Sequence, residues 1–196
     1  TQNAEAMDVG RCRYGFLLND VGGVIDDLIC MQVSPDRFMI VGNAGRRDED
    51  AGALRERVSA EFCDASDDTA KLDLQGPRAA EVLQPKTDVD LGELGYFCFA
   101  HATVAGIECI LSRTGYTGEL GYELYVPAEA VGELWNRLLE MDPVKPAGLG
   151  ARDLLRLEMG YPLYGHEWDM QTTPVEARYA WALPGHTEYT GAEAVT

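Results

Sequence analysis

The chain has 196 residues, 46% hydrophobic and 25% charged, a composition that is typical of folded globular domains and argues against a disordered protein. Its 33 acidic and 16 basic residues give a formal net charge of −17, which would repel nucleic acids and anionic membrane surfaces, so we expect neither as a partner. The five cysteines form no C-x-x-C pair and the three histidines are isolated, so neither a disulfide framework nor a metal site is predicted, and a reducing cytoplasm fits best.

The first third of the sequence predicts three strands and a helix. The segment 19–23 reads Asn-Asp-Val-Gly-Gly between two apolar runs, which is typical of a hairpin turn. A Ser-Pro-Asp turn leads to the third apolar run. Apolar residues then recur at helical spacing among charged ones. The expected elements are strands Tyr14–Leu18, Val24–Val33 and Phe38–Gly42, followed by a helix from Arg46 to Phe62.

The pattern restarts at Lys71, after the acidic segment 64–68, which is a candidate boundary. Further strands alternate with helices, so the whole chain predicts an α+β fold of small antiparallel sheets with helices on one face. After Tyr161, scattered Pro, Gly and aromatic residues predict irregular structure that leads to a short strand. The expected elements are strands Leu72–Leu74, Tyr96–Thr103, Gly106–Arg113 and Tyr122–Val126, and helices Arg78–Leu83, Ala128–Met141 and Ala151–Met159.

One glycine-rich stretch, Ser112 to Glu123, has the pattern of a binding loop, with three glycines at spacing three. Glycine lets a backbone approach a ligand closely, and Glu123 would stand beside the loop at the start of the next strand. An ordinary hairpin with solvent-facing Glu119 and Glu123 explains the same spacing. The pattern differs from the glycine motif of dinucleotide folds and from a phosphate-binding loop. The residues alone leave the binding loop and the plain hairpin open.

Six stretches follow one another across nearly the whole chain: Asn19–Leu28, Val41–Ala44, Leu74–Pro77, Ser112–Glu123, Gly148–Glu158 and Thr172–Glu176. Taken together they resemble one family, the aminomethyltransferases, also called the T-proteins of the glycine cleavage system. Their common order makes the resemblance more specific than any single motif. It implies the T-protein fold, in which this chain would form the first two domains of a three-domain cloverleaf around tetrahydrofolate.

The resemblance also implies a domain organisation. Residues 1–66 would form most of the family's second domain, which carries Asp26. Residues 67–185 would be the returning part of the first domain, which carries the glycine-rich loop and Arg152. Residues 186–196 would lead into a C-terminal domain. The chain would then be the middle portion of a longer enzyme.

Asp26 matches the family's catalytic aspartate, with Asp27 as its structural neighbour. In the implied reaction a methylene group on a lipoyl sulfur passes to tetrahydrofolate while ammonia leaves, so positive charge develops and a proton must move. A fixed carboxylate stabilises such charge and orients or deprotonates the attacking amine. Without the resemblance, the pattern favours a solvated strand end, because the two aspartates follow a Gly-Gly turn.

Four further residues match folate-binding positions of the family. Glu123 would pair both carboxylate oxygens with neighbouring N–H donors of the pterin ring. Tyr116 would offer its ring or hydroxyl to the folate, and Arg152 would line the pocket wall. Asn43 matches the asparagine of the family's Val-Asn-Ala, which reads Val-Gly-Asn-Ala here. For Arg152, the structural alternative is an ion pair with Asp153 or Glu123.

The implied function is a tetrahydrofolate-dependent aminomethyltransferase of one-carbon metabolism and glycine catabolism, whose donor is the lipoylated carrier, the H-protein. Two alternatives stay open: a folate-dependent demethylase of a methylated amine or sulfur compound, and a folate-binding protein without turnover. Folate-binding iron–sulfur repair proteins match less well, because their Lys-Gly-Cys-Tyr-type motif is not found in this sequence. The acidic net charge opposes two commonly acidic partners, but physiological salt would screen this repulsion at long range.

Overall fold

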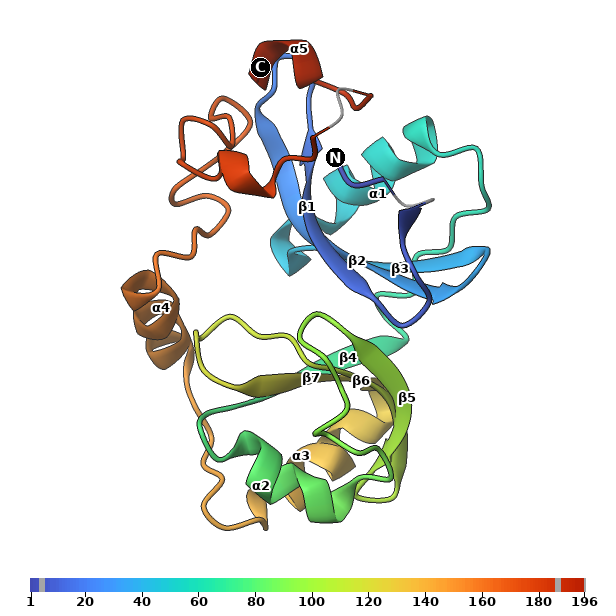
Figure 1. Ribbon diagram of the computed structural model, residues 1–196, viewed down its shortest axis with the longest axis vertical. Coiled ribbons are helices and arrows are strands. Elements are labelled where there is room, and N and C mark those ends of the chain that lie inside the picture. Colours follow the sequence, from blue (N-terminus) through green and yellow to red (C-terminus); the bar gives the residue numbers. More distant parts are fainter. Residues whose placement is uncertain (4–5, 186–187, 196) are drawn as a thin grey trace. The chain divides into compact units, whose positions relative to one another are not determined.

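A computed structural model describes residues 1–3, 6–185 and 188–195. The chain divides into two compact units (Figure 1): unit 1 comprises Thr1–Cys63 and Pro162–Thr196, and unit 2 comprises Asp64–Tyr161. Each unit contains one small antiparallel sheet with helices beside it, so the predicted α+β fold is confirmed. Within the described ranges, no helix is both long and apolar enough to span a membrane.

Unit 1 contains a three-stranded antiparallel sheet in the order β1-β2-β3. Asn19 fastens the turn between the first two strands, because its Oδ1 accepts hydrogen bonds from the backbone N–H groups of Val21 (3.1 Å) and Gly23 (2.9 Å). The hairpin expected from Asn-Asp-Val-Gly-Gly is therefore present. All three predicted strands form, as β1 (Cys12–Leu18), β2 (Val24–Ser34) and β3 (Arg37–Val41).

A 3-10 turn, η2 (Ala44–Arg46), leads from β3 into helix α1 (Arg47–Arg57). The predicted helix end at Phe62 is wrong, because Val58 has extended backbone (φ −101°, ψ 131°). Val58 is exposed and β-branched, so neither burial nor intrinsic propensity holds it in the helix. The first turn of the helix contains three acidic residues after Arg47, and their charges suit the positive end of the helix dipole.

Residues of the C-terminal segment complete the core of unit 1. Trp168 is buried and packs edge-to-face on Phe16 of β1, with ring centroids 5.3 Å apart. The backbone N–H of Val24 donates to the carbonyls of Asp169 (3.0 Å) and Thr172 (3.1 Å), which fixes the segment to the start of β2. The cluster's buried members are Phe16, Leu18, Val24, Trp168 and Ala182.

This packing groups the chain differently from the predicted ranges 1–66 and 67–185. The first boundary lies close to the expected one, at Cys63 and Asp64, but residues from Pro162 onward belong with β1 and β2 rather than with unit 2. The reason is the aromatic cluster, which joins residues about 150 positions apart and leaves no local sequence signal. The expected short strand after Tyr161 is not found among the described residues, where an isolated bridge pairs Tyr164 with Trp168.

The predicted lead-in, residues 186–196, lies partly outside the described residues, which omit 186, 187 and 196. Its described part contains the short helix α5 (Ala192–Val195), whose Ala192 is buried. The assignment of these ranges to particular domains of the family stays a prediction.

Unit 2 contains a four-stranded antiparallel sheet in the order β4-β7-β6-β5. The predicted strands all form, with shifted ends. For example, β5 begins after Phe97, whose left-handed backbone (φ 55°) is incompatible with a strand. The strands are β4 (Thr69–Gln75), β5 (Phe99–Val104), β6 (Ile107–Ser112) and β7 (Gly121–Pro127).

The two faces of this sheet differ in chemistry. Helices α2 (Ala79–Leu83) and α3 (Val131–Leu139) cover one face (Figure 1), where their side chains pack with Leu74 and Leu124 in an apolar core. Because side chains alternate along a strand, the neighbours of these leucines point to the opposite face. That face therefore carries the charged side chains of β4 and β7. A third helix, α4 (Leu149–Glu158), follows α3.

Candidate functional site

In unit 1, the predicted catalytic residue Asp26 is fully buried on β2, opposite Leu17 of β1. Asn43, just beyond β3, holds its carboxylate from two sides. The backbone N–H of Asn43 donates to Oδ2 and its Nδ2 donates to Oδ1, both at 2.8 Å. The solvated-strand-end interpretation is therefore wrong for Asp26, because a buried, clamped carboxylate has a fixed position and orientation.

Asp27 extends this arrangement. Its Oδ2 accepts a hydrogen bond from the Tyr14 hydroxyl (3.1 Å), and its Oδ1 accepts one from Asn43 Nδ2 (3.0 Å). Burial raises the pKa of Asp27 to about 6, and the negative charge of Asp26 adds to the shift. Asn43 is thus the shared donor to two neighbouring carboxyl groups, whereas its predicted contact with a cofactor stays a prediction.

In unit 2, Glu123 lies on β7 with its side chain only 5% exposed. Lys71 Nζ donates to Oε1 at 2.6 Å, while the hydroxyls of Thr114 (2.5 Å) and Tyr125 (3.2 Å) donate to Oε2. Burial opposes ionisation of Glu123, but the Lys71 charge and these hydrogen bonds outweigh it, so its pKa lies below the ordinary value. The solvent-facing interpretation of Glu123 is therefore wrong.

A second carboxylate stands directly beside Glu123. The β4–β7 register places Asp73 opposite Glu123, and Lys71 lies 3.3 Å from Asp73 Oδ1. Arg152 of α4 donates to Asp73 Oδ2 at 3.0 Å. Arg152 thus pairs with Asp73 and not with Asp153 or Glu123, the partners expected for it, and Asp153 pairs with Arg156 instead. Burial and the neighbouring Glu123 charge raise the pKa of Asp73 despite its two cationic partners.

Tyr116, in the glycine-rich loop, contacts the same charged group. The guanidinium carbon of Arg152 lies 4.7 Å from the centre of the Tyr116 ring, a cation–π contact. The Tyr116 ring also stacks on the ring of Tyr161, with the two ring centroids 5.8 Å apart. The three predicted binding residues of unit 2, Glu123, Tyr116 and Arg152, are thus linked through Asp73 and Lys71.

Two glycines of the loop, Gly115 and Gly121, leave room for the side chain of Gln75. A Cβ on Gly121 would lie 1.8 Å from Gln75 Oε1, and one on Gly115 would lie 2.2 Å from the same atom. Gln75 Nε2 donates to the carbonyls of Thr114 (3.2 Å) and Tyr122 (3.3 Å), so its amide joins the two ends of the loop. At these two glycines, the group that approaches the backbone closely is therefore Gln75 of the same chain, and not the expected ligand.

Comparison with known proteins places this arrangement in a family. The family model described as "GCVT N-terminal domain" matches residues 1–185. The chain belongs to this family. It is 45% identical over 186 residues to the aminomethyltransferase of Thermoanaerobacter sp. (strain X514), covering 91% of this chain and 50% of the relative. It is 39% identical to that of Thermotoga sp. (strain RQ2), covering 100% of this chain and 55% of the relative.

A solved structure of the family has the same fold. The crystal structure of the glycine cleavage system aminomethyltransferase T from Bartonella henselae matches with a TM-score of 0.87 and 35% sequence identity. The match covers 98% of this chain and 54% of that chain. The resemblance to the T-protein family and its fold is therefore confirmed. The chain spans about half the length of the curated relatives it matches.

Three residues were not predicted from the sequence: Lys71 and Asp73, which lie beside Glu123 in unit 2, and Asp50 of α1 in unit 1, whose Oδ2 lies beside Gly42 as Asp26 Oδ2 does. Lys71 and Asp73 could have been found, because charges at alternate positions of β4 must share one face. For Asp50 the available signal was the glycine at position 42, just after β3. A side chain at this position would meet the carboxyl oxygens of Asp50 and Asp26.

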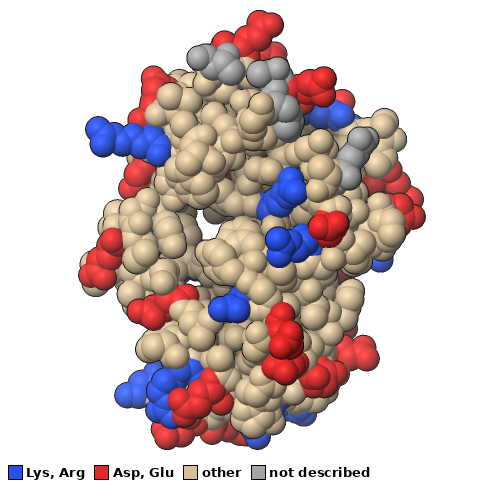
Figure 2. Space-filling model, in the orientation of Figure 1, with Lys and Arg blue, Asp and Glu red and all other residues tan. Residues whose placement is uncertain are grey.

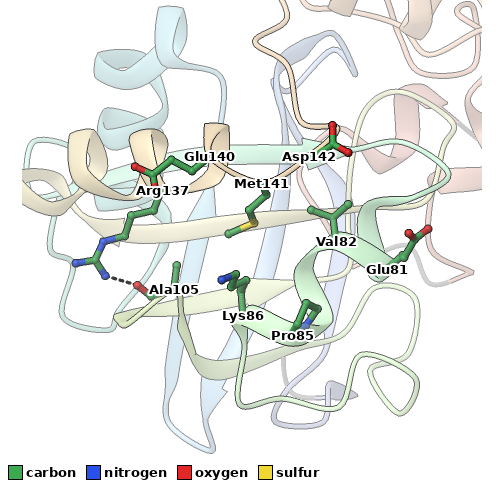
Figure 3. Close-up of a pocket in the computed structure, with 9 residues that line it drawn as sticks. All are labelled: Glu81, Val82, Pro85, Lys86, Ala105, Arg137, Glu140, Met141 and Asp142. Atoms are coloured by element: carbon green, nitrogen blue, oxygen red, sulfur yellow. Dashed lines mark hydrogen bonds between the residues drawn. The ribbon is translucent and has the colours of Figure 1, made fainter.

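A pocket of about 560 Å³ also lies in unit 2, away from these residues. Its wall carries both charge signs, and Arg137 is already engaged there with the carbonyl of Ala105 (Figure 3). None of the predicted site residues lines it. The lining residues are Glu81, Val82, Pro85, Lys86, Ala105, Arg137, Glu140, Met141 and Asp142.

On the face that Figure 2 shows, the acidic residues are dispersed. Figure 2 shows Asp and Glu side chains in scattered groups, with Lys and Arg between them rather than in one continuous band. Within the described part of the chain, no group of three or more His, Cys, Asp or Glu side chains is arranged to hold a metal ion.

Proposed function

We propose that this chain carries catalytic and folate-binding residues of a tetrahydrofolate-dependent aminomethyltransferase of the glycine cleavage system. The enzyme would take the methylene unit from an aminomethyl-lipoyl carrier, the H-protein, and release ammonia. The observation that carries the proposal is the buried Asp26 carboxylate, clamped by Asn43 in the stretch that matches the family. Relatives named aminomethyltransferase over most of the chain support it.

The side chains of unit 2 fit a folate in their chemistry. Glu123 is held ionised, so it offers only acceptors, as the N–H donors of a pterin edge require. Tyr116 supplies an aromatic ring, which Arg152 and Tyr161 contact in this structure, and Arg152 supplies a cation. These three residues would hold the cofactor, and bound tetrahydrofolate would supply the amine that receives the one-carbon unit.

In unit 1, Asp26 would stabilise the positive charge that develops in the reaction and would orient or accept the proton of the attacking amine. Its two hydrogen bonds from Asn43 fix both oxygens without neutralising them, so the carboxylate is prepared to stabilise positive charge that develops nearby. A carboxylate that does not reorient during the reaction provides this stabilisation without a reorganisation cost. Asp27, fixed by Tyr14, would keep Asn43 in place.

We further propose a cytoplasmic location. The five cysteines, all within the described residues, form no disulfide, which supports a reducing compartment.

The experiment that tests the proposal is ammonia release by the intact protein. We expect ammonia when both the aminomethyl-lipoyl carrier and tetrahydrofolate are present, and none when either is omitted. Replacing the carrier with a methylated amine or sulfur compound tests the demethylase alternative. Turnover with such a donor and none with the carrier would overturn the proposal. Folate binding without turnover of any donor would favour the non-catalytic folate-binding protein.

A further inference from the structure

Asp50 stands out as a buried carboxyl group with few partners. It lies in the first turn of α1 and is only 8% exposed, although its neighbours Asp48 and Glu49 are exposed. Its Oδ1 is buried and has no hydrogen-bond partner among the described residues. A buried carboxylate without donors is costly, because burial penalises the charged form.

Gly42 shows how closely this group approaches Asp26. A Cβ placed on Gly42 would lie 2.6 Å from Asp50 Oδ2 and 3.0 Å from Asp26 Oδ2. The two carboxyl oxygens thus converge on the space beside Gly42, and a residue with a side chain there would have to displace at least one of them. Two ionised carboxylates in such contact repel each other strongly when buried, so a single proton between them stabilises the pair.

The surrounding donors decide which oxygen carries the proton. Both oxygens of Asp26 accept hydrogen bonds from Asn43, so Asp26 is stabilised as the anion. Asp50 has an unpartnered Oδ1, and its Oδ2 converges with Asp26 Oδ2 on the space beside Gly42. We propose that Asp50 and Asp26 share one proton, with Asp50 as the donor, and that Asp50 is a positioning residue that holds Asp26 as a single, fixed anion.

The electrostatic surroundings agree with this assignment. Burial raises the pKa of Asp50 to about 8, and the hydrogen bond with Asp26 and the charge of Asp26 add to the shift. Glu49 raises the pKa further, and Arg46 lowers it. The charged and titratable groups facing the pair are Asp26 and Asp27 of β2, Arg46 of η2, Glu49 of α1, and Tyr164 from the C-terminal segment.

Two of the three guanidinium nitrogens of Arg46 bind other groups, and the third, NH2, is buried without a hydrogen-bond partner among the described residues. Its Nε donates to the Ile25 carbonyl (3.1 Å), its NH1 pairs with Glu49 (3.0 Å), and its guanidinium carbon lies 4.7 Å from the centre of the Tyr164 ring. No ion pair joins Arg46 to Asp50 within the described residues. In the absence of a cationic partner, the proton on Asp50 neutralises one of the two adjacent buried carboxylates.

The inference rests on the proposed function for its consequence, which is a limit on activity at high pH. Below a pH of about 8 Asp50 keeps its proton and remains a donor to Asp26. Above it Asp50 loses its proton, the donor to Asp26 disappears, and two anions face each other. Turnover should therefore fall as the pH rises through about 8.

The direct test is a carboxyl ¹³C NMR titration of the intact protein, with the Asp50 resonance assigned by its loss in Asp50→Asn. We expect this carboxyl to titrate near pH 8. Titration below about pH 5, as for an ordinary exposed aspartate, would overturn the shared proton. This readout needs no activity, so it decides the inference even if the protein fails to turn over the lipoyl carrier.

The kinetic test compares two substitutions at the same position. Asp50→Ala removes the donor and should lower turnover about 10- to 100-fold, the scale of a misplaced catalytic group. Asp50→Asn keeps an N–H donor, so it should retain more activity than Asp50→Ala at neutral pH and lose the decline near pH 8. Asp48→Asn, an exposed control on the same helix turn, should keep the wild-type profile. An Asp50→Asn profile that still declines near pH 8 would contradict the positioning role.

Discussion

Glu123 already accepts three hydrogen bonds from its own chain, from Lys71, Thr114 and Tyr125. An ionised carboxylate offers about four acceptor sites, so about one remains for a ligand. Pairing with two adjacent donors therefore requires one of the present donors to move. Two of them have a second acceptor in reach: Ser112 Oγ lies 2.8 Å from Thr114 Oγ1, and the charged Asp73 Oδ1 lies 3.3 Å from Lys71 Nζ. We expect Lys71 to turn toward Asp73 when a ligand occupies Glu123.

Replacing Glu123 with Gln tests its recognition role. The substitution keeps the size of the side chain but exchanges one acceptor for a donor that would face other donors. Folate affinity should fall by about 1.5–3 kcal/mol, the scale of a hydrogen bond to a charged group. Isothermal titration with tetrahydrofolate measures this directly.

The matched control is Glu119→Gln, an exposed carboxylate in the same loop, which should bind folate as the wild type does. A melting curve for each variant separates lost recognition from lost folding, since the amide introduced by Glu123→Gln would also face Lys71. Equal folate affinity for Glu123→Gln and the wild type would remove Glu123 from the binding site.

The glycine-rich loop of residues 112–121 is an element built around the amide of Gln75. Gly121→Ala would bring a Cβ to 1.8 Å from Gln75 Oε1, and moving that amide would break its hydrogen bonds to the loop ends. We expect a loss of about 1–3 kcal/mol in the free energy of unfolding, as for other overpacked sites. Urea denaturation measures it.

A double-mutant cycle identifies the cause. Gly121→Ala should cost less when Gln75 is already Ala, because the group that it clashes with has gone. Additive effects of the two substitutions would show that Gly121 is needed for some reason other than Gln75.

At the level of elements, the strands followed directly from the sequence because their signals are local. The Asn-Asp-Val-Gly-Gly turn and the apolar runs predict the β1–β2 hairpin without any tertiary information. The ends of α1 and β5 could not be predicted as well, because they depend on one residue each: Val58, which is exposed, and Phe97, which adopts a left-handed backbone.

The candidate site was predictable only in part, for the same reason. Asp26, Glu123 and Arg152 came from motifs that resemble the family. The convergence of Asp50 and Asp26 beside Gly42 brings a helix to a sheet, and the contact of Arg152 with Asp73 joins residues 79 positions apart. Such contacts depend on how elements pack, which apolar and polar periodicity does not encode.

At the level of the whole molecule, Trp168 anchors the C-terminal segment in the core of unit 1. It is buried among Phe16 and Tyr179, so Trp168→Ala should destabilise unit 1 by about 3–5 kcal/mol, the range for truncating a buried aromatic residue. Amide hydrogen exchange should then accelerate in β1 and β2 more than in β4 to β7.

Trp135→Ala is the control, because this half-exposed tryptophan lies on α3 in unit 2. It should leave exchange in β1 and β2 unchanged. Faster exchange confined to β4–β7 in Trp168→Ala would show that the segment from Pro162 onward supports unit 2 instead.

In the proposed enzyme, unit 1 would supply the carboxylate that acts in the reaction, and unit 2 would supply Glu123, Tyr116 and Arg152 for folate recognition. The most direct measurement compares turnover and folate affinity in Asp26→Asn, with Asp20→Asn as an exposed control on the neighbouring turn. We predict that Asp26→Asn lowers turnover by about 10²- to 10⁴-fold, as expected for a positioned acid–base or electrostatic group, and leaves folate affinity within a few fold. Wild-type turnover in a folded Asp26→Asn protein would contradict the account.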